Sequence, residues 1–66
     1  MKITVNGTDR SVREGETLQS LVTDEGHSPG HVFVRHNGQM PERRSWPQLD
    51  LEPGDTVEII KIISGG

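Results

Sequence analysis

The sequence predicts an α+β domain in which one main helix packs across a mixed β-sheet. Apolar and polar residues alternate near both ends of the chain, and one segment between them has the i, i+3, i+4 apolar spacing of a helix. The chain has 66 residues, and a domain of this size buries only about 60% of the surface of its unfolded chain. A deep catalytic cleft is therefore hard to build here.

The first elements are two strands joined by a tight turn. Alternation of apolar and polar residues predicts a strand over residues 1–6. Asn6-Gly7 is the pair favoured in two-residue hairpin turns, because both positions need a positive φ. We therefore expect a second strand over about residues 9–13, with Val12 inward, to pair with the first.

A helix is predicted within residues 14–26. Thr17 is a suitable N-cap and Gly26 a suitable stop. The apolar face is formed by Leu18, Leu21 and Val22. This face is the one that should cover the sheet.

A third strand, a crossover and a last strand complete the domain. Residues 31–36 alternate, with Val32 and Val34 on one face, and Asn37-Gly38 ends them. Residues 39–51 have no clean period, so we expect only one helical turn there, around 43–46, with Trp46 as an apolar plug. Pro53-Gly54 suits a type II turn before a strand at 56–63.

This order of elements outlines the β-grasp, or ubiquitin-like, arrangement, in which the last strand lies centrally beside the first. Residues 1–63 would form the domain, and residues 64–66 a flexible Ser-Gly-Gly tail. By the parity of the last strand, Val57 and Ile59 face the helix, while Ile60 and Ile62 face away.

Ile60, Ile62 and Phe33 would then form an exposed apolar patch. Patches of this kind mark partner surfaces, although isolated exposed apolar residues are also ordinary. The patch is therefore the candidate docking face.

The composition excludes several classes of protein. There is no cysteine, which removes thiol nucleophiles, disulfides and thiolate metal sites. A net charge of −3 is opposite to the basic footprint of nucleic-acid binders. No segment reaches the length of a membrane span, and the first residues lack the apolar core of a signal peptide. We expect a cytoplasmic protein with neither nucleic acid nor membrane as partner.

Three histidines raise the question of a metal site. His27, His31 and His36 fall in a loop and near the two ends of a strand, with no helical i, i+4 pair among them. We interpret them as solvated surface residues, and expect neither a metal nor another cofactor.

The sequence ends in Ser64-Gly65-Gly66. Such an end is either a frayed terminus or an arm slim enough to enter a narrow channel, because glycine has no side chain. The reactive group would be the α-carboxylate of Gly66. A carboxylate is a poor acyl donor until it gains a better leaving group, usually by adenylation with ATP.

The whole chain resembles the ThiS family of ubiquitin-like sulfur carriers of thiamine biosynthesis. The resemblance is carried by "MKITVNG", "ETLQSLV", "VRHNGQMPERRSW" and "LEPGDTVEIIKIISGG". It implies a carrier and not an enzyme, and we expect a monomer that forms transient complexes. In that family an ATP-dependent activating enzyme adenylates the terminal glycine, sulfur from a cysteine desulfurase relay displaces AMP, and thiazole synthase receives the sulfur from the thiocarboxylate.

The resemblance also assigns roles to residues. Gly66 would carry the sulfur, and Gly65 and Ser64 would enter the partner's active site. Docking would use the patch of Ile60, Ile62 and Phe33. Three alternatives stay open: a carrier serving molybdopterin, cysteine or a sulfur-containing secondary metabolite; a modifier joined to lysines through Gly66; and a passive binding module.

Overall fold

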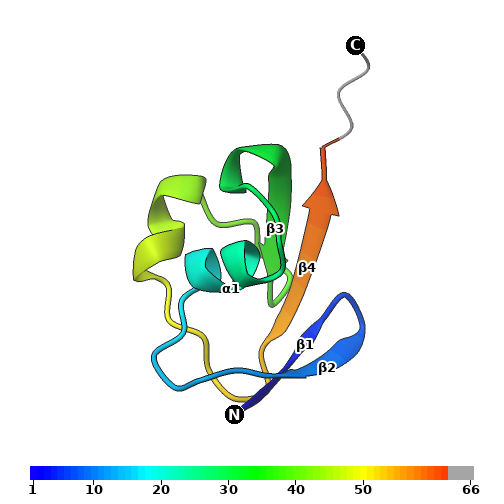
Figure 1. Cartoon of the computed structure of the whole chain (residues 1–66), viewed down its shortest axis with the longest axis vertical. Coiled ribbons are helices and arrows are strands. Elements are labelled where there is room, and N and C mark those ends of the chain that lie inside the picture. Colours follow the sequence, from blue (N-terminus) through cyan, green and yellow to red (C-terminus); the bar gives the residue numbers. More distant parts are fainter. Residues whose placement is uncertain (63–66) are drawn as a thin grey trace.

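The computed structural model describes residues 1–62 of the chain. These residues form one mixed four-stranded sheet that is covered on one face by helices (Figure 1). In chain order the elements are β1 (Lys2–Val5), β2 (Thr8–Ser11), α1 (Leu18–Asp24), the 3-10 helix η1 (Pro29–His31), β3 (Val32–His36), the 3-10 helix η2 (Arg43–Gln48) and β4 (Thr56–Lys61). The strand order is β2-β1-β4-β3, and β1 and β4 are parallel. The last strand therefore lies centrally beside the first, as predicted.

Both Asn-Gly pairs form the predicted turns. Asn6 and Gly7 have φ values of 50° and 80°, and Asn37 and Gly38 have 50° and 83°. These left-handed conformations suit Asn and Gly better than other residues. The first pair makes Val5 and Thr8 register partners at the end of the hairpin.

The second strand is shorter than predicted and begins earlier. The two-residue turn pairs Thr8 at once, so β2 spans Thr8–Ser11 instead of residues 9–13. Val12 lies just beyond β2, where its backbone N–H donates to the Met1 carbonyl oxygen at 2.8 Å. The Val12 side chain packs against the core, so the predicted inward orientation is confirmed. The prediction that Val12 belongs to the second strand is wrong.

Helix α1 has specific signals at both ends. The Thr17 hydroxyl accepts a hydrogen bond from the Ser20 N–H at 3.1 Å, and the Thr17 N–H donates to Ser20 Oγ at 2.9 Å. At the other end Gly26 has a φ of 85°, and the His27 N–H donates to the Val22 carbonyl oxygen at 3.1 Å. This is a Schellman end, for which glycine is the preferred residue. The predicted cap and stop are confirmed.

The core lies between α1, η2 and the inner face of the sheet. Its buried residues are Ile3, Val5, Leu18, Leu21, Val22, Val32, Val34, Trp46, Leu51, Val57 and Ile59. The helical turn of the crossover is the six-residue η2, longer than the single turn predicted. Trp46 is 2% exposed, and its Nε1–H donates to the Pro41 carbonyl oxygen at 3.2 Å.

A buried carboxylate joins the ends of three segments. Asp55, 6% exposed, accepts hydrogen bonds from His36 Nε2 at 2.8 Å, Asn37 Nδ2 at 3.0 Å and the Glu52 N–H at 2.9 Å. His36 is therefore not the solvated residue that we predicted. Its partner lies 19 residues further along the chain and comes into contact only when β4 pairs with β3.

This network predicts a stability that depends on pH. Burial raises the pKa of Asp55, but hydrogen bonds from His36, Asn37 and the Glu52 backbone outweigh it and hold the pKa below its ordinary 3.8. Because the folded-state pKa is lowered, the stabilisation is complete above about pH 4 and is lost as the pH falls through that lower value. We expect Asp55→Asn to cost about 1–3 kcal/mol at neutral pH.

Urea unfolding of both proteins from neutral to acid pH measures this. The difference between wild type and Asp55→Asn should shrink as the pH falls below about 4. A difference that stays constant down to the acid limit would contradict the role given to the ionised carboxylate.

Candidate functional site

Two of the three predicted docking residues lie side by side on the outer face of the sheet, and the third follows the end of β4. Phe33 and Ile60 are register partners on β3 and β4, and they are 49% and 41% exposed. Ile62 is 39% exposed, and its N–H donates to the His31 carbonyl oxygen at 3.0 Å, so pairing with this segment continues beyond Lys61. We call these three residues the outer patch.

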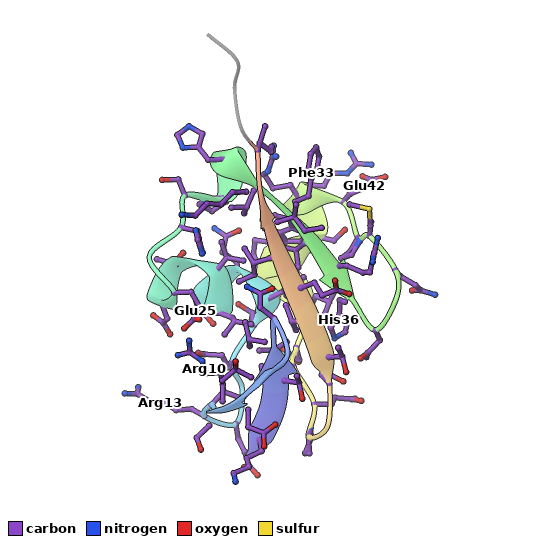
Figure 2. All side chains as sticks on the ribbon, turned by 90° about the vertical axis from the view of Figure 1, so that its right-hand side faces the viewer. Arg10, Arg13, Glu25, Phe33, His36 and Glu42 are labelled. Atoms are coloured by element: carbon purple, nitrogen blue, oxygen red, sulfur yellow. The ribbon has the colours of Figure 1, made fainter. Side chains whose placement is uncertain are left out.

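The two faces of β4 differ as the parity prediction requires. Val57 and Ile59 are 0% and 8% exposed and face the helices. Ile60 has the opposite parity and faces away from the core. Figure 2 shows Phe33 near the end of the sheet where β4 finishes. The apolar character of the outer patch therefore contributes little to the core and is available to a partner.

A charged pair borders the outer patch. Arg35 and Glu58 are the next outward-facing register partners, with 3.5 Å between Arg35 Nη1 and Glu58 Oε1. Both side chains are nearly half exposed, and such pairs add little to stability. An apolar centre with a polar rim is the usual anatomy of a protein interface.

A more polar cleft lies beside the end of β4. Its volume is about 610 Å³, and its lining includes His27, His31, Lys61 and Ile62. His31 is exposed and His27 is half-buried. Residues 1–62 contain no group of three or more His, Cys, Asp or Glu residues able to hold a metal ion. Sequence reasoning missed this cleft, because it depends on where the loop after α1 meets the sheet.

The predicted reactive residues, Ser64, Gly65 and Gly66, lie outside the described residues. The outer patch lies at the C-terminal end of β4, which precedes these residues in the sequence. Within residues 1–62 no helix has the length and apolar character needed to cross a bilayer.

The strand order, with the last strand beside the first and one main helix across the sheet, defines a ubiquitin-like β-grasp protein. The chain belongs to the ThiS family, whose model matches residues 3–66. It is similar to the thiamine biosynthesis protein (ThiS) from Geobacter metallireducens. The crystal structure of that protein aligns with a TM-score of 0.84 and 29% identity over 100% of both chains. Its NMR structure gives 0.78 and 29%, covering 100% of this chain and 88% of that one.

Two curated relatives are considerably longer than this chain. The thiazole synthases of Paramagnetospirillum magneticum and Magnetococcus marinus are 30% and 32% identical to it over 66 residues. The alignment covers 100% of this chain but 20% of each relative. The chain therefore spans about one-fifth of the length of these proteins.

Proposed function

We propose that this protein is the sulfur carrier for thiazole formation in thiamine biosynthesis and that Gly66 carries the sulfur. The observation that supports this best is the likeness to a ThiS protein over the full length of both chains, with a TM-score of 0.84. The family match, which extends through residue 66, supports it as well. In this role the protein is a substrate of other enzymes and not itself a catalyst.

The chemistry requires two steps at the carboxyl group of Gly66. First, a carboxylate oxygen attacks the α-phosphorus of ATP and releases pyrophosphate, which leaves an acyl-adenylate. A persulfide from a cysteine desulfurase relay then attacks the carboxyl carbon, and the bond from that carbon to the oxygen of AMP breaks. A second thiol reduces the resulting acyl disulfide, which releases the thiocarboxylate and leaves a disulfide on the relay. The acyl-adenylate is electrophilic and accepts the sulfur, whereas the resulting thiocarboxylate is nucleophilic and can donate it. The same terminus therefore serves both activation and delivery.

The outer patch is well placed to bring this terminus to a partner. Gly66 is four residues beyond Ile62, so covalent geometry keeps it within about 14 Å of that residue. A partner that docks on the outer patch therefore has its active site within reach of residues 64–66. Gly65 and Gly66 have no side chains and would pass a narrow channel.

Thiazole synthase is the proposed recipient of the sulfur. Two proteins of that name contain a segment similar to the whole of this chain. When a carrier-like segment and a thiazole synthase share one chain, each is present at a high effective concentration near the other. This arrangement is an advantage only if the two act together. The other proposed partners are an ATP-dependent activating enzyme and the cysteine desulfurase relay.

A charge in the outer patch should weaken docking without unfolding the domain. We expect Ile60→Glu and Ile62→Glu each to reduce affinity for thiazole synthase, and thiazole output, by about tenfold or more, because a central apolar contact becomes a desolvated charge. Thr56→Glu adds the same charge on the outer side of β4 at its other end and is the matched control.

Titration calorimetry and urea unfolding of the three variants separate docking from folding. The patch assignment is wrong if Ile60→Glu binds as tightly as Thr56→Glu, or loses affinity only because it unfolds. A thiocarboxylate that forms but gives no thiazole would indicate another receiving pathway. Isopeptide links from Gly66 to lysines would indicate a protein modifier.

A further inference from the structure

The polar cleft beside the end of β4 shares Ile62 with the outer patch. The Ile62 N–H donates to the His31 carbonyl oxygen at 3.0 Å, which holds this residue against the segment that leads into β3. Figure 1 shows that segment and the end of β4 together, at the end of the sheet away from the N-terminus. A partner that binds the outer patch at Ile62 therefore also comes close to the cleft.

Lys61 gives this cleft a positive charge. It has the same parity as Val57 and Ile59, so its side chain leaves β4 on the side of the helices, opposite to Ile60. Unlike Val57 and Ile59, Lys61 is exposed. The four ion pairs found within residues 1–62 do not include it. Its ammonium group is therefore available to a ligand.

The other polar residues of the cleft are hydrogen-bond donors. His27 is half-buried and His31 is exposed, and both line the cleft together with Ser28. An imidazole ring offers one N–H when neutral and two when protonated. The Ser28 hydroxyl does not cap η1 and remains free to donate. One cation surrounded by N–H and O–H donors is a suitable environment for a carboxylate.

The positive character of the cleft is local. The chain has a net charge of −3, yet none of the described residues that line the cleft is acidic. The acidic residues nearest in sequence are Asp24 and Glu25, at the end of α1. Glu25 is already paired with Arg10, with 3.1 Å between Oε1 and Nη2. Asp24 is exposed and does not line the cleft.

We propose that this cleft binds an aspartate or glutamate side chain of the protein that docks on the outer patch. The inference rests on the proposed function, because it takes thiazole synthase as that protein. An open cleft with one lysine holds a free anion weakly, since both charges stay solvated. A carboxylate on a docked partner is already at a high effective concentration near Lys61. Apolar contacts at Ile60 and an ion pair at Lys61 would together fix the orientation of the carrier.

Calorimetric titration of thiazole synthase with charge variants tests this. We expect Lys61→Glu to weaken binding by about tenfold or more, and Lys61→Arg to stay within about threefold of the wild type. Lys2→Glu is the matched control. The Lys2 carbonyl oxygen accepts from the Gly54 N–H, at the opposite end of the sheet. Its charge is screened from the cleft at about 0.15 M salt, so its affinity should not change.

A zero-length cross-linker identifies the contact directly. A carbodiimide joins an amine to a carboxylate, with loss of water, only where the two groups touch. In the complex it should link Lys61 Nζ to one aspartate or glutamate of thiazole synthase, as mass spectrometry of the digested product would show. Raising the salt from about 0.05 M to about 0.5 M should weaken the wild type more than Lys61→Gln, because the ion pair is screened.

Two results would overturn the inference and leave the proposed function standing, provided that the wild type binds thiazole synthase and forms a thiocarboxylate. One is equal affinity of Lys61→Glu and Lys2→Glu, and the other is a complex in which Lys61 is not cross-linked. A wild type that does not bind thiazole synthase would overturn both. Urea unfolding of Lys61→Glu shows whether its loss of affinity is separate from folding.

Discussion

Deletion of Gly66 should abolish sulfur transfer and leave the fold intact. The shortened chain still ends in a glycine carboxylate, but that group lies one residue, about 3.5 Å, short of the place where a partner must activate it. Misplacement of a reacting group by even 1 Å can cost roughly 100-fold in rate, so we expect thiazole output to fall by at least about that factor. Reconstitution with the activating enzyme, a sulfur donor and thiazole synthase measures the loss.

Ser64→Ala is the matched control for this deletion. It alters the tail without shortening it, so most activity should remain. The buried core lies between Ile3 and Ile59, and both variants should therefore unfold in urea as the wild type does. Full activity without Gly66 would contradict the assignment of the sulfur to this residue, and so would an equal loss in Ser64→Ala.

Trp46→Ala should bring the domain close to complete unfolding. Trp46 is 2% exposed and is the largest side chain of the core. Truncation of a buried tryptophan costs about 3–5 kcal/mol, because apolar burial is lost and a cavity remains. A chain of 66 residues has a total stability of only roughly 3–10 kcal/mol. The variant should therefore retain only a small part of the free energy of unfolding of the wild type.

Far-UV circular dichroism measures the unfolding of Trp46→Ala in urea, because this variant lacks the single tryptophan that fluorescence would require. Trp46→Phe keeps an aromatic ring but removes the hydrogen bond to Pro41, so it should lose about 1–2 kcal/mol. A Trp46→Ala domain within about 1 kcal/mol of the wild type would show that η2 is not part of the cooperative core.

The elements that were predicted correctly are those specified by neighbouring residues. Two Asn-Gly pairs supplied the positive φ values of their turns, and Thr17 and Gly26 supplied the ends of α1. The contact between His36 and Asp55 escaped prediction because it joins residues 19 apart that meet only through strand pairing. Local patterns carry no information on which side chain will face such a residue.

The candidate site also contains one feature that the local sequence pattern predicts and others that it does not. Once a single helix covers one face of the sheet, parity alone exposes Ile60, and the structure agrees. The cleft beside the end of β4 could not be predicted, because it depends on where the loop after α1 meets the sheet. The roles of residues 64–66 come from the family resemblance and concern the part of the chain beyond the described residues.

The intact mass of the protein, recorded after incubation with ATP, a ThiS-activating enzyme and a sulfur donor, tests the central claim most directly. Replacement of one oxygen by sulfur should appear only when all three are present, and fragmentation should place the sulfur on Gly66. A mass that stays unchanged, or a sulfur atom found on any other residue, would contradict the proposed carrier function.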